Sequence, residues 1–111
     1  MDKLIADCKS ILGVRKPLRV IVRETRNDNC ALYWNEGKRH TIELFLDTIR
    51  GDDRNFETIL AHEIVHAWQT ENKPRSKDHG RIFQNKAWEL ECALKTLGYN
   101  VSKLYIKGID K

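Results

Sequence analysis

Two histidines and a glutamate stand close together at residues 62–66, which read His-Glu-Ile-Val-His. On a helix, positions i and i+4 lie about 40° apart around the axis, so His62 and His66 share one face. Two imidazoles at this spacing can bind one tetrahedral Zn²⁺ ion. Glu63 lies beside them, near enough to act as a general base towards a zinc-bound water. The alternative is a pair of surface histidines on an amphipathic helix.

A catalytic zinc ion needs a third protein ligand and one open coordination position. His79 opens the next predicted helix, and its helical-wheel position falls within the apolar stripe of that helix. Because this stripe must face the core, we expect His79 to point inward. A core histidine held by hydrogen bonds is one alternative, and Glu89 or Glu91 as the third ligand is another. Glu91 lies off the apolar stripe and Glu89 only at its edge, which favours His79.

The elements that must position these residues follow from hydrophobic periodicity and turn residues. The predicted helices span residues 3–12, 56–71 and 79–97, and the predicted strands span residues 18–23, 30–34, 40–46 and 99–107. In the helix over residues 56–71, apolar side chains cover one side and the His-Glu-x-x-His residues the other, which provides one face for a core and one for a site. The first three strands predict a meander. This order predicts an α+β fold, a small and mostly antiparallel sheet packed with three helices.

The stretch from His62 to Trp68, followed by Asp78 to Gln84, resembles the SprT-like (Spartan-type) family of zinc metalloproteases. That family shows His-Glu-x-x-His followed by His-Gly-x-x-Phe, and the joint pattern is much more specific than either half. The resemblance covers about residues 40–106. It implies a zincin-like metalloprotease core in which His62, His66 and His79 bind Zn²⁺ and Glu63 is the catalytic base.

The resemblance also implies a role linked to DNA, because several members of the family cleave proteins that are crosslinked to DNA. Family members often carry a zinc-binding or DNA-binding extension after the protease core, whereas this sequence ends at Lys111. We therefore expect a single domain over residues 1–111, in which any DNA contact comes from the core itself.

Basic residues gather in two segments of the chain. The 111 residues carry 20 Lys and Arg against 16 Asp and Glu, a net charge of +4. Residues 15–26 and residues 73–86 each hold five cations and one acidic residue, so the rest of the chain is slightly acidic. The segment that joins the histidine helix to His79 must border the cleft, and its cations are Lys73, Arg75, Lys77 and Arg81. They are candidates for binding DNA phosphates, with an ordinary solvated loop as the alternative.

Some residues are candidates for supporting roles in proteolysis. Tyr99 and Tyr105 are candidates for stabilising an oxyanion, although each is more often the edge of a packed core. The strand Thr41–Leu46 is a candidate for holding an extended substrate by β-augmentation.

The remaining histidine, cysteines and tryptophans carry weaker signals. We expect His40 at the surface, because it stands at a turn-to-strand edge away from the motif. Cys8 and Cys92 are expected to be packing residues. Trp68 falls on the core side of its helix, whereas Trp88 lies outside the apolar arc of its helix and is either exposed or covered by another element.

Composition excludes several classes of protein. The sequence has no run of about 18 apolar residues and no secretory signal, so we expect no membrane association and no export. Three widely spaced cysteines without a Cys-x-x-Cys pair exclude a disulfide framework and a cysteine-only zinc ribbon. We expect a reducing cytoplasmic compartment, with association with DNA if the function is linked to DNA; the sequence does not indicate an oligomeric state.

Three functions are compatible with these features. The first is a zinc metalloendopeptidase with protein substrates that are bound or crosslinked to DNA. The second is a DNA-binding or adaptor module with a structural zinc ion, and the third is a peptidase for a dedicated protein target without a DNA requirement. Glu63 favours a peptidase over the structural site, because a structural zinc ion does not need a base beside it.

Overall fold

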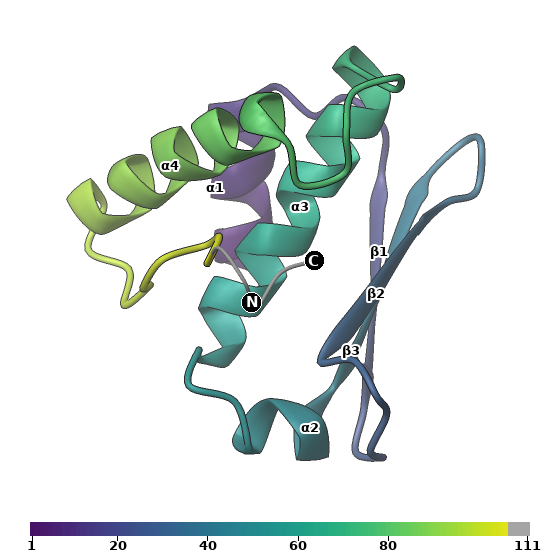
Figure 1. Cartoon of the computed structure of the whole chain (residues 1–111), viewed down its shortest axis with the longest axis vertical. Helices are drawn as coiled ribbons and strands as arrows, with labels where there is room; N and C mark the ends of the chain where they lie inside the picture. Colours follow the sequence, from purple (N-terminus) through teal and green to yellow (C-terminus); the bar gives the residue numbers. More distant parts are fainter. Residues whose placement is uncertain (107–111) are drawn as a thin grey trace.

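The computed structural model describes residues 1–106, which form four helices and a three-stranded sheet. The elements are α1 (Asp2–Leu12), β1 (Leu18–Arg23), β2 (Ala31–Asn35), β3 (His40–Phe45), α2 (Leu46–Arg50), α3 (Phe56–Asn72) and α4 (Arg81–Thr96). The predicted α+β class is confirmed, and the short α2 is an additional helix that directly follows β3. Figure 1 shows α3 in the middle of the molecule, with the sheet on one side and α1 and α4 on the other.

β3 is the central strand of the sheet, between β1 and β2. β1 pairs with β3 in parallel, with Leu18 opposite His40, and β2 pairs with β3 antiparallel, with Ala31 opposite Leu44. The sheet is therefore mixed, and the predicted meander is wrong. Side chains on both faces of β3 are buried, whereas those of β1 and β2 are half-buried or exposed, which explains why β3 takes the central position.

α3 is enclosed by other elements along most of its length. It begins after Asn55, whose side-chain oxygen accepts the N–H of Thr58 at 3.0 Å and so caps the helix. Its fully buried apolar side chains are Leu60, Ala61, Ile64, Val65 and Ala67. The face that carries His62 and His66 is buried as well, because it is directed towards the sheet rather than towards open solvent.

α4 begins two residues later and ends one residue earlier than predicted. Its buried residues are Phe83, Ala87, Leu90, Glu91 and Leu94. The apolar ones are spaced i, i+4, i+7 and i+11, the spacing of a helix face that packs on a core. Ile82 and Leu97, which the periodicity places in the core, are 40% and 56% exposed, whereas the buried Glu91 contradicts its predicted position off the packed face.

The segment after α4 has no regular secondary structure in the described residues. Residues 99–106 form no strand, so this prediction is wrong for them, and residue 107 lies outside the described residues. Hydrogen bonds join side chains to its backbone: Asn55 Nδ2 to the Asn100 carbonyl, the Ser102 N–H to Thr58 Oγ1, the Leu104 N–H to Glu91 Oε1, and His62 Nδ1 to the Leu104 carbonyl. Since side chains satisfy these backbone groups, and Val101 and Leu104 pack into the core, the segment is held without a partner strand.

Several single-residue predictions are also decided by the fold. Cys8 is buried in the core as predicted, whereas Cys92 is exposed and is not a packing residue. Trp68 packs half-buried against the core, and Trp88 is 66% exposed. Within residues 1–106, no helix is both long enough and apolar enough to cross a lipid bilayer.

Candidate metal centre

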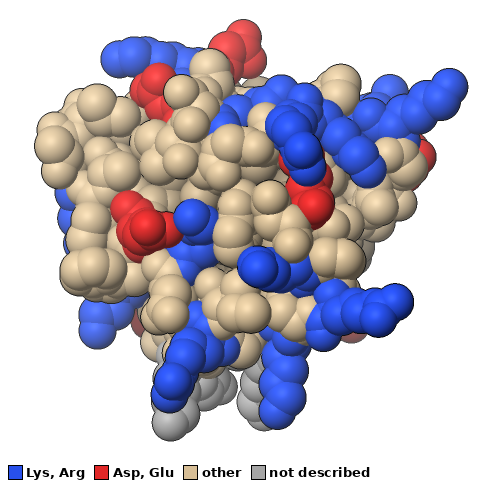
Figure 2. All heavy atoms as spheres, turned by 90° about the horizontal axis from the view of Figure 1, so that it is seen from above, with Lys and Arg blue, Asp and Glu red and all other residues tan. Residues whose placement is uncertain are grey.

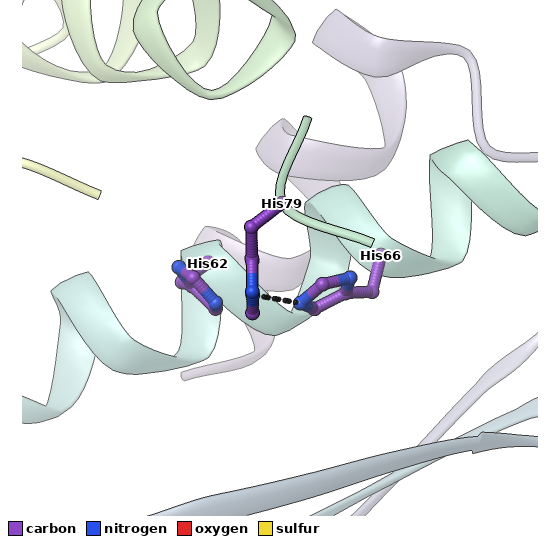
Figure 3. A group of neighbouring side chains, drawn as sticks. All are labelled: His62, His66 and His79. Atoms are coloured by element: carbon purple, nitrogen blue, oxygen red, sulfur yellow. Dashed lines mark hydrogen bonds between the residues drawn. The ribbon is translucent and has the colours of Figure 1, made fainter. Parts of the chain in front are cut away.

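His62, His66 and His79 lie together, and their candidate ligand atoms are all within 4.8 Å of one another. His62 and His66 project from adjacent turns of α3, and His79 reaches down between them from the segment that precedes α4 (Figure 3). His66 Nε2 and His79 Nε2 are 3.1 Å apart. Nitrogen ligands of a tetrahedral ion, with metal–nitrogen bonds of 2.0–2.1 Å, lie roughly 3.4 Å apart. The three histidines are therefore close enough to bind one metal ion.

The position of His79 depends on a segment that folds back along α3 after the helix ends (Figure 1). The side-chain amide of Gln69 donates to Ser76 Oγ at 2.9 Å and to the Lys77 carbonyl at 2.7 Å, which ties this segment to α3. A Cβ atom at Gly80 would lie 2.8 Å from the Cβ atom of Lys77, so the tight turn after His79 requires glycine. This close approach is the physical reason for glycine in the His-Gly-x-x-Phe pattern.

Oxygen atoms lie against Nδ1 of both helical histidines and set the orientation of their rings. His62 Nδ1 donates to the carbonyl of Leu104, because a carbonyl can only accept, and this leaves Nε2 as the nitrogen of His62 that could bind a metal ion. Near His66, the Gln69 Oε1 and Asp78 Oδ1 atoms lie 3.4 and 3.3 Å from Nδ1. Metal-binding histidines typically use this second nitrogen to bind a carbonyl or carboxylate, as both do here.

Aromatic rings hold the histidine cluster from two sides. The ring of Phe83 lies 5.0 Å from the ring of His62, 4.4 Å from that of His66 and 5.0 Å from that of His79. Tyr33, on β2, stacks against His66 at 6.2 Å. The final residue of His-Gly-x-x-Phe is therefore a packing residue that contacts all three imidazoles.

The cluster lines a cleft of about 480 Å³, together with the carboxylate-bearing Glu63. Glu63 Oε2 is 3.8 Å from His62 Nε2, and its side chain is 12% exposed. The other lining residues are Asp28, Asn29, Cys30, Ala31, Leu32, Tyr33, Asp52, Arg54, Ile59 and Asp78. A metal ion on the three histidines would thus have a carboxylate and an open cleft beside it.

One wall of the cleft is a small polar cluster that the sequence did not indicate. Cys30 Sγ donates to Asp52 Oδ2 at 3.3 Å, and the backbone N–H of Arg54 donates to Asp52 Oδ1 at 2.8 Å. Burial, together with the nearby Asp52 carboxylate, raises the pKa of the Cys30 thiol to about 11, so this thiol is neutral at physiological pH. Burial would also raise the pKa of Asp52, but hydrogen bonds from Arg54 and Cys30 outweigh it and lower that pKa.

The other candidate ligands and catalytic groups occupy different places. Glu89 pairs with Lys86 at 2.9 Å on the exposed side of α4, and Glu91 binds the Leu104 N–H, so neither belongs to the histidine cluster. The Tyr99 hydroxyl donates a hydrogen bond to the Asp7 carboxylate on α1, so this hydroxyl is bound away from the histidine cluster. Tyr105 is closer to the cluster, with its ring 5.9 Å from that of His79.

His40 is fully buried, so its predicted surface position is wrong. Its Nδ1 atom is 2.8 Å from the Tyr33 hydroxyl, and its Nε2 atom is 2.7 Å from Glu71 Oε2. Because β3 is the central strand, its first residue lies between β1 and β2 and contacts Glu71 near the end of α3. The turn-to-strand position of His40 in the sequence carries no information about this long-range packing.

Lys73, Arg75, Lys77 and Arg81 are all exposed, and only Asp78 and His79 from this segment line the cleft. The backbone N–H groups of Arg15 and Lys16 donate to Glu71 near the end of α3, which places the other basic segment beside the start of this one. Figure 2, a view from above Figure 1, shows Lys and Arg side chains spread over this face with few acidic ones. The start of the first basic segment, Arg15 and Lys16, therefore lies beside the second basic segment.

This α+β chain thus carries three histidines that could hold a metal ion, beside a glutamate in a cleft. A sequence model of the SprT-like family matches residues 10–103, and the chain belongs to this family. A search of curated proteins found no match to this chain. Family membership indicates a metalloprotease-like function, and the three histidines are consistent with a metal cofactor.

Proposed function

We propose that the protein is a zinc-dependent metalloendopeptidase in which His62, His66 and His79 bind Zn²⁺ and Glu63 is the general base. The observation that carries this proposal is the convergence of three imidazoles beside a carboxylate in a cleft. Imidazole nitrogen suits Zn²⁺, and three protein ligands leave the fourth position for water or substrate, as in catalytic rather than structural sites.

The chain's own residues supply the proton transfers of peptide hydrolysis. A bound Zn²⁺ ion supplies two things, a lowered pKa for a coordinated water and polarisation of the scissile carbonyl. Glu63 takes a proton from the attacking water and delivers it to the leaving amine nitrogen, so the carboxylate returns to its starting state. Its 3.8 Å distance from His62 Nε2 supports this role.

β2 is the strand best placed to hold an extended substrate. The predicted strand for this purpose, Thr41–Leu46, is unsuitable because β3 pairs on both of its edges. β2 pairs with β3 on one side only within residues 1–106, and its residues Ala31–Tyr33 line the cleft. A substrate backbone added to the outer edge of β2 would pass along the metal centre.

Glu63→Gln tests the assigned base. We expect this variant to keep its zinc content and to lose proteolysis by about 10²- to 10⁴-fold, the usual contribution of a general base. Zinc content is measured by elemental analysis, and proteolysis by cleavage of an unfolded basic protein. Turnover of the variant at the wild-type rate would contradict the role of Glu63.

A DNA-linked role is the second part of the proposal, and the basic face in Figure 2 is the observation that favours it. Phosphate binding by Lys73, Arg75, Lys77 and Arg81 would bring proteins on DNA close to the cleft. The three free cysteines favour action in a reducing compartment such as the cytoplasm.

One assay separates the three candidate functions. Zinc-loaded protein is incubated with a basic protein substrate, with and without single-stranded DNA. Cleavage stimulated by DNA supports the DNA-linked protease, cleavage independent of DNA supports a dedicated peptidase, and DNA binding without cleavage supports an adaptor with structural zinc. DNA affinity should fall steeply with salt and weaken when the four cations are replaced by alanine; a flat salt response would contradict phosphate binding.

A further inference from the structure

We propose that Glu91 is a positioning residue of the metal centre, acting on His62 through the backbone of Leu104. This inference rests on the proposed metal site, in which His62 binds through Nε2. Glu91 lies on α4, whereas His62 lies on α3 and Leu104 in the segment that follows α4. The three residues therefore join three separate parts of the chain at one point.

Two hydrogen bonds at a single residue make this connection. The Leu104 carbonyl accepts from His62 Nδ1, and the Leu104 N–H donates to Glu91 Oε1 at 3.1 Å. The second oxygen of Glu91 accepts from Lys95 Nζ at 2.9 Å. A shift of Leu104 would therefore move the acceptor that orients the His62 imidazole.

The acceptor carbonyl lies in a segment without a helix or strand to fix it. Backbone hydrogen bonding within a regular element normally fixes the position of a carbonyl group. Residues 99–106 lack such an element, and their position depends on side-chain anchors. The anchors at Asn100 and Ser102 lie upstream, whereas the Glu91 contact is on the same residue as the acceptor.

The burial of Glu91 points to the same role. Glu91 is 8% exposed and stands on the buried face of α4 among Ala87, Leu90 and Leu94. A carboxylate on such a face costs free energy unless it is paired and hydrogen-bonded, and an apolar residue would pack there without that cost. The bonds to Leu104 and Lys95 satisfy the carboxylate, and one of them leads directly to a histidine of the cluster.

The His62 bond has a defined consequence for metal binding. With its hydrogen on Nδ1, the imidazole presents Nε2 as a lone-pair donor towards His66 and His79 (Figure 3). Loss of partners of this kind typically weakens metal binding by about 10- to 100-fold. A purely structural role for Glu91 would lower the stability of the fold but leave the intrinsic zinc affinity of the folded protein unchanged.

Three variants of the full chain separate these two roles. Glu91→Met keeps an apolar side chain of similar size on the packed face but removes the acceptor. Glu91→Gln keeps an oxygen that can accept the Leu104 N–H. Lys95→Ala is the matched control, because it removes the ion pair from a half-exposed side chain and leaves the contact with Leu104.

The measurements are zinc affinity by competition with a chelator, the visible spectrum of the Co²⁺-substituted protein, and the unfolding midpoint of the metal-free protein. We expect Glu91→Met to weaken zinc binding by about 10- to 100-fold and to change the Co²⁺ spectrum. Glu91→Gln and Lys95→Ala should stay within a few-fold of wild-type affinity and keep its spectrum.

Wild-type zinc affinity and spectrum in Glu91→Met, whatever its unfolding midpoint, would overturn the proposal. Equal weakening in Lys95→Ala would overturn it as well. The proposed peptidase function fails in a different way, when wild-type protein binds zinc but cleaves nothing, and in that case the affinity measurements still decide the role of Glu91.

Discussion

His40 and His66 both lie against the ring of Tyr33, but their ring nitrogens have different surroundings. Both nitrogens of His40 contact protein groups, the Tyr33 hydroxyl and the Glu71 carboxylate. His66 instead directs Nε2 towards a nitrogen of His79 at 3.1 Å, in a cluster of three imidazoles. A histidine with oxygen partners at both nitrogens has its hydrogen-bonding groups satisfied, whereas the facing nitrogens of His66 and His79 could also bind a cation.

The environment of Glu71 makes the His40 region a structural one. Burial would raise the pKa of Glu71, but hydrogen bonds from His40 and from the backbone N–H groups of Arg15 and Lys16 lower it to about 2. The carboxylate thereby joins the start of β3 and the α1–β1 connection to the end of α3. The comparison predicts that changes in this region affect stability, and that changes in the cluster affect metal binding.

The largest expected effect is the loss of zinc in His79→Ala. This change removes a proposed ligand, so affinity should fall by more than about 100-fold, beyond the effect of losing an outer partner. Elemental analysis after dialysis and chelator competition measure it, and Glu89→Ala is the control. Unchanged zinc content in His79→Ala would assign the third ligand to another residue. It would also contradict the expectation that changes in the histidine cluster affect metal binding.

Glu71→Ala should have the next largest effect, on folding rather than on metal. Removing the carboxylate leaves the buried His40 Nε2 donor without its acceptor, and an unsatisfied buried donor typically costs about 1–3 kcal/mol. Urea unfolding of the metal-free protein measures this loss, and zinc affinity should stay within a few-fold of wild type. The control is Glu24→Ala, which breaks an exposed pair with Arg50 and should change stability little. A zinc affinity as low as that of His79→Ala would show that the two regions are not separate.

The depressed pKa of Glu71 predicts a pH dependence for the same region. A carboxyl group whose pKa is lower in the folded state stabilises the fold above its ordinary pKa and loses that contribution as the pH falls through the folded value. The loss should therefore extend from about pH 4.5 down to about pH 2. Unfolding free energies of the metal-free protein measured across this range should fall more steeply for wild type than for Glu71→Gln. Parallel curves would contradict the role of Glu71.

Tyr33→Phe should have the smallest effect. It tests whether the Tyr33 hydroxyl, which contacts His40, affects only the His40 region and not the histidine cluster. The change removes the hydrogen bond to His40 but keeps the ring against His66. Stability should fall by about 1 kcal/mol, the usual net value of such a bond. Zinc affinity should not change measurably, as chelator competition can test. A clear loss of zinc affinity would mean that the hydroxyl, through the ring, also positions His66.

Features that depend on local spacing were predictable. Asn55 caps α3 and the periodic apolar residues after it form the helix, so the shared face of His62 and His66 follows from helix geometry. His79 lies with His62 and His66, but not as part of an apolar helix stripe, because α4 begins only at Arg81 and Ile82 and Leu97 are exposed. The turn at Gly80 and the hydrogen bonds from Gln69 instead hold the segment that carries His79 against α3.

The strand order and the surroundings of the site were not predictable from local pattern. Nothing in the periodicity of residues 18–46 indicates that β3 lies between β1 and β2, and the burial of His40 depends on that order. The sequence presents Glu91 only as a competing ligand, and no local pattern indicates its contact with Leu104. Cys30 and Arg54 lie in the wall of the cleft, and nothing in the sequence around either residue indicates this position.

The amino-acid sequence by itself determined the metal-binding pattern of this protein, because helical spacing alone places His62, Glu63 and His66 on adjoining positions of one surface. Only the tertiary structure decided that β2 is the strand at the cleft, that His40 is bound to Glu71, and that the Leu104 carbonyl orients His62. The physical reason is the separation in sequence between the residues that interact. Helix spacing acts over four residues, whereas these contacts join residues 31 and 42 positions apart, whose meeting depends on how the whole core packs.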